Sequence, residues 1–415
     1  MSSPFRALRS RNYRLFFIGQ GISLIGSWMT RLATAWLVYR LTDSAFLLGL
    51  VSFAGQVPSM VLPPLVGVWV DRWDRRKVLI ATQVLAMLQS LALAALTLSG
   101  YVNIPWVVGL ALFQGIVNAV EIPTRQSFVV RMIDNRADLS NAIALNSSNF
   151  NATRLVGPAI AGAVVAAVGE GYCFLIDGLS YIAVIAGLLA MRLAPEVKPP
   201  STRHVLEELG DGWRYVVRTT PIRSLLIFLA VVGVISMPYM VLMPLVAGRT
   251  LGGGPDTLGW LMAASGVGAL TCAVRLVLRK SVVGLIRRMA VYIGVFGVAC
   301  VGLGLSQWLW LSMALMATTG YTLMYQVVAT NTIVQTIVDD DMRGRVMSFY
   351  TIALLGSSPI GSLLSGSLAA RIGVPATFVA GGVACVLSAL WFWRRLPAIR
   401  AAVRPRYVEL GIIDP

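Results

Sequence analysis

The chain has 415 residues, of which 57% are hydrophobic and only 13% are charged, and its mean hydropathy is +0.76. Soluble domains carry about 25% charged residues, so this chain lacks the polar surface that a water-soluble protein of its length needs. The net charge of +16 does not indicate nucleic-acid binding, because long apolar segments separate the cations and no basic domain stands as a unit. The composition predicts a membrane protein.

Twelve apolar segments are each long enough for a membrane-spanning helix, which needs about 20 mostly apolar residues. They lie near residues 13–40, 45–70, 78–99, 105–127, 141–167, 172–192, 223–247, 257–278, 288–305, 308–333, 347–370 and 375–394. Their positions predict an all-α membrane protein with an N-terminal six-helix half, a cytoplasmic connector, a C-terminal six-helix half and a cytoplasmic tail. The predicted boundaries are 1–192, 193–222, 223–395 and 396–415.

The two halves show a weak internal repeat. Gly49 and Gly55 in the second span have counterparts at Gly259 and Gly266 in the eighth. Two pseudo-symmetric halves of six helices around a cytoplasmic connector are typical of transporters that work by alternating access. An ion channel would need a short re-entrant filter segment, and the sequence contains none that we recognise.

The connectors carry their cations on one side of the membrane. Of the 34 Lys and Arg residues, 29 fall in connectors on the side of the N-terminus, and only Arg40, Arg249 and Arg371 fall on the opposite side. Cytoplasmic loops hold the excess of Lys and Arg, so we expect both termini in the cytoplasm and the protein in the cytoplasmic (inner) membrane. The first apolar segment is too long for a cleaved signal peptide.

Residue types that catalyse reactions or bind metals are scarce. The four cysteines lie in apolar segments without metal-ligand spacing, and the single histidine, His204, lies in the charged central connector. Catalytic triads, metal clusters and phosphate-binding loops each need residues that this chain does not place together. We therefore expect no enzymatic activity, no cofactor, no metal and no direct use of ATP.

The connector after the second span has a recognisable pattern of a glycine, an aspartate and several arginines. A glycine there lets helices approach closely, and arginines stay beside anionic lipid headgroups. The residues are Gly67, Asp71, Arg72, Arg75 and Arg76. The pattern resembles the loop signature of the major facilitator superfamily, G-x-x-x-D-R-x-G-R-[RK], with Asp74 in place of the second glycine. The resemblance implies the major facilitator fold and a cytoplasmic gate, and the alternative is a plain cationic anchor.

Further motifs resemble one branch of that superfamily, which includes enterobactin-type siderophore exporters and macrolide efflux proteins. They are Pro123-Thr-Arg125-Gln126, Leu139-Ser-Asn141-Ala142, Gly212-Trp213-Arg214-Tyr215 and Met342-Arg343-Gly344-Arg345. The resemblance extends from about residue 10 to residue 395. It implies export of a small amphipathic compound, such as a drug or a siderophore-like molecule.

Two helical motifs bear on ion coupling. Gly157, Pro158 and Gly162 in the fifth span form a small-residue face, which by itself indicates close helix packing. The face also resembles the superfamily's antiporter motif, which implies exchange against protons. In the fourth span, Ala111 stands where the superfamily signature R-x-x-Q-G has its arginine, so coupling through that arginine is not available.

Four ionisable residues fall inside predicted spans, where charge is costly and is by default a functional candidate. Their depths suggest that Arg154 pairs with Glu121 and Arg31 with Asp177. Glu121 is a candidate for proton coupling or cation recognition, or it bridges Arg125 at the cytoplasmic end. Asp177 is more simply a structural partner. The two arginines are candidates for binding an anionic substrate.

Other polar and aromatic side chains of the spans are further substrate candidates, with bonds or contacts between helices as the alternative. They are Asn118, Asn149, Gln326, Asn331, Trp28 and Tyr239. We expect a monomeric exporter that exchanges its substrate for protons and contacts membrane lipids. The alternatives are a transporter of lysophospholipids or similar lipids and, in another class, a non-transporting membrane receptor or assembly protein.

Overall fold

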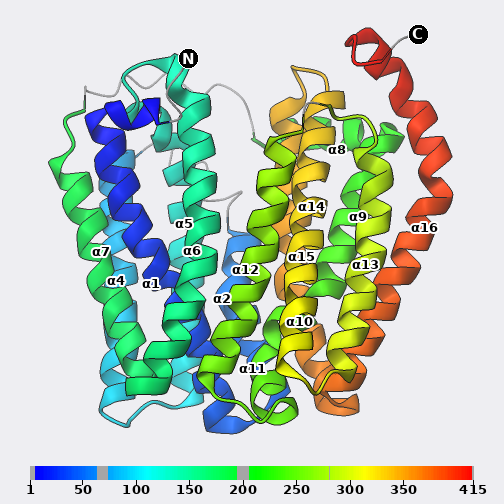
Figure 1. Cartoon of the computed structure of the whole chain (residues 1–415). Coiled ribbons are helices and arrows are strands. Elements are labelled where there is room, and N and C mark those ends of the chain that lie inside the picture. The colour runs from blue at the N-terminus through cyan, green and yellow to red at the C-terminus, as the bar shows by residue number, and fades with distance from the viewer. Residues whose placement is uncertain (1–4, 63–72, 194–204, 280, 414–415) are drawn as a thin grey trace. The chain divides into compact units, whose positions relative to one another are not determined.

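In the computed structural model (Figure 1), the described residues are 5–62, 73–193, 205–279 and 281–413, and these form helices and no strand. The predicted all-α class is therefore confirmed. Helices suit a membrane because they satisfy their backbone polar groups internally. The chain divides into two compact units: unit 1 comprises Met1–Pro199 with Pro244–Gly266, and unit 2 comprises Pro200–Met243 with Val267–Pro415.

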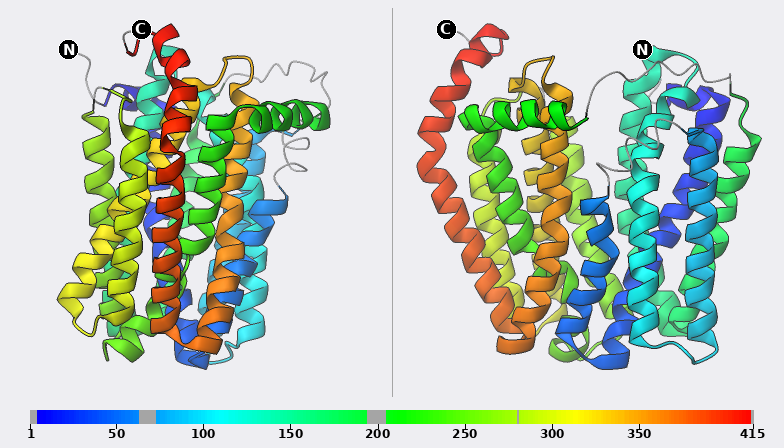
Figure 2. Two further views of the ribbon diagram at one scale, coloured as in Figure 1. Left: turned by 90° about the vertical axis from the view of Figure 1, so that its right-hand side faces the viewer. Right: turned by 180° about the vertical axis from the view of Figure 1, so that it is seen from behind.

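Among its described residues, unit 1 has six long helices. They are α1 (Arg11–Thr42), α2 (Ala45–Val61), α4 (Arg75–Leu98), α5 (Ile104–Phe128), α6 (Leu139–Val168) and α7 (Glu170–Ala190). Short 3₁₀ turns lie at Arg6–Arg9, Val129–Met132 and Arg136–Asp138, and a π-helical turn, η4, lies at Val246–Thr250. The helix α1 packs against α6 and α7, while α5 packs between α2 and α4 (Figures 1 and 2).

Unit 2 contains the remaining long helices. They are α8 (Val205–Arg218), α9 (Thr220–Ser236), α13 (Leu285–Leu305), α14 (Leu309–Ile337), α15 (Arg343–Ile372) and α16 (Val374–Glu409). Two short helices, α10 (Pro238–Val241) and α11 (Met243–Leu245), follow α9, and α12 (Pro255–Val277) begins in unit 1 and ends in unit 2. Within unit 2, α13 packs against α14 and α16, and α9 packs against α15 and α16.

Each predicted span overlaps a helix in the part of the chain that the structure describes. Within the described residues, nine helical segments are long and apolar enough to cross a membrane by length and composition, and α2 is a shorter apolar helix. The count of twelve spans stays a prediction, because the polar residues of α1 and α14 weaken their hydropathy.

The segment predicted as one span near residues 223–247 is interrupted. The helix α9 ends at Ser236, and the chain continues through α10, α11 and the η4 turn to Thr250. Pro238 and Pro244 explain the break, since a proline inside a helix removes one backbone hydrogen bond and clashes with the preceding turn.

Two helical regions were not predicted. The connector contains α8, which lies across the ends of the other unit 2 helices (Figure 2). The helix α16 continues past residue 395 to Glu409, because Leu396, Ile399, Val403 and Tyr407 form a buried stripe at helical spacing. The charged residues of this segment concealed the stripe.

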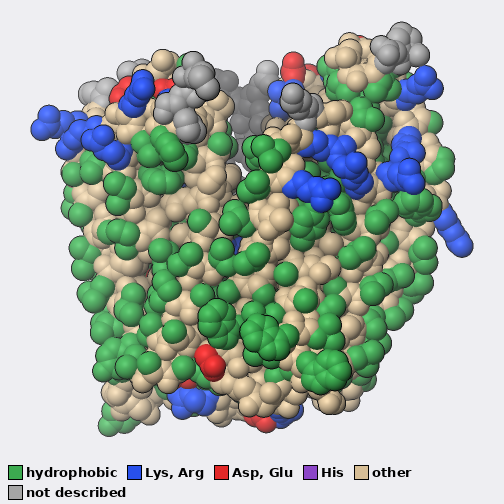
Figure 3. Space-filling view, viewed as in Figure 1, with side chains coloured by type: hydrophobic (Ala, Val, Ile, Leu, Met, Phe, Trp, Pro, Cys, Tyr) green, Lys and Arg blue, Asp and Glu red, His purple; other side chains and the backbone are tan. Residues whose placement is uncertain are grey.

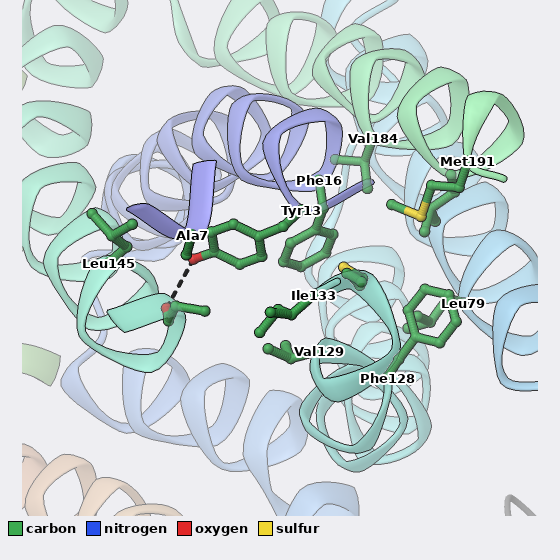
Figure 4. Close-up of a cluster of buried hydrophobic side chains, with 13 residues drawn as sticks. Ala7, Tyr13, Phe16, Leu79, Phe128, Val129, Ile133, Leu145, Val184 and Met191 are labelled. Carbon is green, nitrogen blue, oxygen red and sulfur yellow. Dashed lines mark hydrogen bonds between the residues drawn. The ribbon is translucent and has the colours of Figure 1, made fainter. Parts of the chain in front are cut away.

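A compact aromatic cluster closes one end of unit 1 (Figure 4). Tyr13 and Phe16 of α1 pack there with Phe128 and Met132, all at most 2% exposed. The Tyr13 hydroxyl donates to the carbonyl oxygen of Ala142 over 2.8 Å, so the cluster also bonds α1 to α6. Burial of such side chains contributes roughly 1.5–3 kcal/mol each, which fixes the helix ends near the predicted gate.

The surface of the units is mostly apolar along the helices. Figure 3 shows apolar side chains over their flanks and most of the visible Lys and Arg side chains near their upper ends. This distribution suits helices whose flanks face lipid and whose ends face headgroups and water.

Candidate functional site

The described part of the predicted gate is a helix start. Asp74, which replaces the signature's glycine, is the N-cap of α4, and its side chain accepts hydrogen bonds from the backbone N–H groups of Arg76 and Lys77 at 2.9 and 3.2 Å. The Arg76 guanidinium donates to the carbonyl oxygens of Leu188 and Leu189 at 2.9 and 2.8 Å. It thereby satisfies the last turn of α7. The predicted gate residues Gly67, Asp71 and Arg72 lie outside the described residues.

Arg31 and Trp28 lie together on α1. The Arg31 guanidinium carbon is 4.8 Å from the centre of the Trp28 ring, a distance at which a cation and an aromatic face attract. Trp28 is 5% exposed, and its ring meets the edge of Phe150 on α6 at 5.7 Å between centroids. Arg31 is exposed although it lies near the middle of a long helix. Trp28 is therefore a fixed support, and Arg31 presents an accessible cation beside it.

Asp177 joins three helices of unit 1. It is 2% exposed, and its Oδ2 atom accepts hydrogen bonds from Thr30 on α1 at 2.9 Å and from Ser90 on α4 at 2.5 Å. Its charge also acts on Arg31 over a longer distance. The contact with α1 that the sequence suggested is thus made chiefly through a hydroxyl, and Ser90 was not foreseen.

Glu121 pairs with a residue on its own helix. Its Oε1 atom lies 2.8 Å from Nε of Arg125, one turn further along α5. Glu121 is 8% exposed, so a bond to a cation compensates its burial. Of the two partners that the sequence left open for Glu121, the structure places Arg125 in contact. Arg154 lies on α6, half-buried.

The small-residue face of α6 packs against two other elements of unit 1. A Cβ atom on Gly157 would lie 2.5 Å from Cβ of Trp28, and one on Gly162 would lie 2.9 Å from Cα of Gly259 on α12. Pro158 is buried between them. Only glycine allows backbones to approach this closely, so the face is at least a packing device.

The other predicted substrate residues are dispersed. Asn118 accepts a hydrogen bond from Gln114 at 3.1 Å, Asn149 donates to the Phe17 carbonyl oxygen at 3.4 Å, and Asn331 accepts from Gln335 at 2.7 Å. In unit 2, Tyr239 is 2% exposed against the edge of Phe296. Gln326 is 1% exposed, and neither polar atom of its side chain has a hydrogen-bond partner among the described residues.

Two ion pairs at the other end of unit 1 were not predicted. Nε of Arg40 lies 2.7 Å from Oε1 of the buried Glu170, and Arg249 pairs with Asp43. Arg40 and Arg249 stood out in the sequence only as exceptions to the charge asymmetry. Their acids lie 130 and 206 residues away, so sequence proximity gave no signal of either pair.

Two of the branch motifs meet in unit 2. Gly212 of α8 faces Arg345 and Phe349 of α15, and Asp211 lies 3.5 Å from Nη1 of Arg345. The Tyr215 hydroxyl donates to Oδ2 of Asp339 at 2.9 Å, and burial raises the pKa of Tyr215 above its usual value, so this hydroxyl stays a donor. We call these contacts the α8 clamp.

Comparison with known proteins identifies the family. The family model described as transmembrane secretion effector matches residues 2–408. The staphyloferrin A transporter of Staphylococcus aureus is 26% identical over 92% of this chain and 96% of its own length. The multidrug efflux pump Tap of Mycolicibacterium fortuitum is 28% identical over 86% of this chain and 88% of its own length.

Solved structures agree on the fold. The nucleoside transporter NupG superposes with a TM-score of 0.73 at 13% identity, covering 94% of this chain and 99% of NupG. The predicted major facilitator fold is therefore confirmed, and with it the interpretation of the chain as a multi-pass membrane transporter. The chain belongs to the transmembrane secretion effector family of the major facilitator superfamily.

Proposed function

We propose that this protein exports a small amphipathic compound, of the drug or siderophore-like class, across the cytoplasmic membrane by alternating access and proton antiport. The named activities of the relatives, a siderophore transporter and a multidrug efflux pump, support this substrate class. Both termini lie in the cytoplasm in this proposal, consistent with the 29 cations on one side. The protein acts as a monomer, since each chain supplies both halves of the fold.

The observation that carries the proposal is the exposed Arg31. A charge near the middle of a membrane-spanning helix is costly in hydrocarbon, so an exposed one faces a water-filled pathway. Beside it lies Trp28, held by Phe150, whose ring offers an apolar surface. A cation next to an aromatic face suits a compound with an anionic group and an apolar body. Arg154, whose charge also acts on Arg31, extends the same polarity.

In this proposal, the structure is closed to the outside at the end of unit 1 that carries the Arg40–Glu170 and Arg249–Asp43 ion pairs. The Asp43–Arg249 pair joins the end of α1 to residues 244–266, and the close approach of Gly162 to Gly259 joins α6 to the same segment. Opening the protein to the outside would separate these contacts, and the start of α4 at Arg75 and Arg76 would then help to close the cytoplasmic side.

Glu121 is our candidate for the proton-accepting group. It is a buried carboxylate whose bond to Arg125 would be lost on protonation, so proton binding and the local bond are linked. We expect Glu121→Gln to bind substrate but to lose the dependence of export on the proton gradient. Arg125→Lys, which retains a cation, is the matched control. Gradient-dependent export by Glu121→Gln would exclude this residue as the coupling group.

The experiment that tests the function is uptake into everted membrane vesicles, with a panel of anionic, neutral and cationic amphipathic compounds. We expect accumulation of one or more anionic compounds that stops when the proton gradient is collapsed. Arg31→Gln should lower this accumulation about tenfold or more, because one charge-assisted hydrogen bond is worth about 1.5–3 kcal/mol. Arg192→Gln, which removes an exposed cation just after the end of α7, is the control. Equal flux in vesicles with and without the protein would refute the proposal.

A further inference from the structure

Three arginines and three tyrosines surround a hollow on unit 2, between the end of α12, the start of α13 and the middle of α14. The hollow has a volume of about 100 Å³, and its lining consists of Arg275, Leu276, Arg279, Arg288, Tyr292, Tyr321 and Tyr325. Nothing in the proposed export pathway uses these residues. Figure 3 shows Lys and Arg side chains gathered near the upper ends of this unit's helices, with apolar side chains below them.

Among the described residues, no ion pair joins a cation of the hollow to an acid. From Thr257 to Val338 the sequence contains no Asp or Glu. In the described part of unit 2, the polar contact of Arg275 is with a tyrosine, Nη1 lying 3.4 Å from the Tyr321 hydroxyl. Three like charges around one space repel one another unless an anion from outside the chain lies between them.

Two buried groups of the hollow also lack partners. Tyr325 is 3% exposed, and its hydroxyl has no hydrogen-bond partner among the described residues. Nη1 of Arg279 is likewise buried without one, although the same side chain donates to the Ser281 carbonyl oxygen at 2.6 Å and to that of Val283. A buried donor without an acceptor costs free energy. Both groups would be satisfied by oxygen atoms of a ligand in the hollow.

The surroundings indicate a lipid. Val277 and Leu278, which follow Arg275 and Leu276, are 83% and 75% exposed. Leu276 and Arg279 also line a second hollow, whose other walls are the apolar Val282, Leu285, Val328 and Ala329 together with Ser281 and Thr332. Exposed and groove-lining apolar side chains thus adjoin the cationic hollow, as an acyl chain adjoins a headgroup.

Tryptophans mark the depth of the membrane interface in the same unit. Arg287, next to Arg288, lies 5.7 Å from the ring of Trp393, and Arg395 lies 5.0 Å from the ring of Trp391. Both rings are about two-fifths exposed. Tryptophan gathers at the headgroup level of membranes, so the cationic hollow lies where lipid phosphates are found.

We propose that this hollow binds the phosphate of an anionic phospholipid. The arginine guanidinium groups would form paired hydrogen bonds with phosphate oxygens, as their planar shape allows, and the Tyr325 hydroxyl would donate a further bond. A zwitterionic lipid would bring its own cation beside the three arginines, so an anionic lipid is favoured. The inference does not depend on the exported substrate or on proton coupling.

The test is binding of short-chain phosphatidylglycerol to the detergent-purified full chain, measured by native mass spectrometry against phosphatidylcholine of the same chain length. We expect phosphatidylglycerol to bind at least about tenfold more tightly. Arg275→Gln with Arg288→Gln should remove that preference. Arg287→Gln with Arg395→Gln also removes two positive charges but leaves the lining of the hollow unchanged. This control variant should still prefer phosphatidylglycerol.

Tyr325→Phe removes one hydroxyl and leaves the charge of the hollow unchanged, and we expect it to weaken phosphatidylglycerol binding several-fold. If thermal unfolding shows that the double arginine variant does not fold, the binding measured for Tyr325→Phe tests the proposal. Equal binding of the two lipids, or unchanged binding by both hollow variants, would overturn the proposal. So would displacement of phosphatidylglycerol by inorganic phosphate at the same concentration, since the site would then recognise a free anion rather than a lipid.

Discussion

Two substitutions of Asp177 can distinguish a structural role from a role in transport. Its Oδ2 atom accepts from Thr30 and Ser90, while Oδ1 has no hydrogen-bond partner among the described residues. An asparagine can place its carbonyl oxygen at the Oδ2 position and its amide nitrogen at the Oδ1 position. Asp177→Asn therefore keeps both hydrogen bonds and removes the charge, whereas Asp177→Ala removes both.

The magnitudes follow from these contacts. In Asp177→Ala two hydroxyl groups lose a shared acceptor, and each buried group left without a partner costs about 1–3 kcal/mol. Because Ser and Thr hydroxyls in helices can instead bond the carbonyl oxygen one turn back, we take the lower half of that range. The free energy of unfolding should fall by about 2–4 kcal/mol in Asp177→Ala and by about 1 kcal/mol or less in Asp177→Asn.

The assay is reversible unfolding in mixed micelles, followed by export measured on the same variants. Asp177→Asn should export at a rate close to the unmodified protein if the residue joins helices and does no more. Ser90→Ala is the matched control, since it removes one of the two donors and should cost about half as much as Asp177→Ala. Equal stability of the alanine variant and the unmodified protein would refute the reasoning, as would full loss of export in a stable Asp177→Asn.

Other contacts give further expectations. Gly162→Ala places a Cβ atom 2.9 Å from a backbone Cα of α12 and should lower the free energy of unfolding by about 1–3 kcal/mol. In the control Gly109→Ala the new Cβ atom meets nothing within 4 Å, so stability should not fall. Chemical denaturation measures the free energy of unfolding of both variants. Asp211→Asn should weaken the α8 clamp by removing the charge that faces Arg345 at 3.5 Å, and faster proteolysis of the central connector would report it. Tyr215→Phe should act in the same direction by about 1 kcal/mol, and unchanged hydrogen exchange in α8 would contradict the clamp.

The positions of the helices could be predicted because hydropathy determines where a chain crosses a membrane. Their interruptions and extensions could not be predicted as well. The break after Ser236 depends on two prolines whose effect varies with the neighbouring helices. The extension of α16 to Glu409 depends on four buried residues among arginines, a pattern that an average over the whole segment hides.

The sequence could name candidate site residues, and it could not give their contacts. The sequence singled out Arg31, Glu121, Arg154 and Asp177 because charges inside membrane spans are rare. It could not find Ser90 or Thr30, since hydroxyl residues are common in helices and only the packing of α1, α4 and α7 brings these two to Asp177. The rotation of each helix about its axis decides such contacts, and a sequence does not fix that rotation.

The arginines behind the net charge of +16 differ in whether they contact an acidic side chain. In unit 1, Arg40, Arg125 and Arg249 each contact an acid of the chain, and Arg76 contacts the carbonyl oxygens that end α7. In unit 2, the stretch from Val267 to Val338 contains no Asp or Glu in the sequence, and it contributes all three arginines of the hollow. Because the chain does not supply the counter-charge, the membrane is the nearest source of one. In our two proposals, the excess of cations orients the protein in the membrane, and part of that excess binds anionic lipid at the unit 2 hollow.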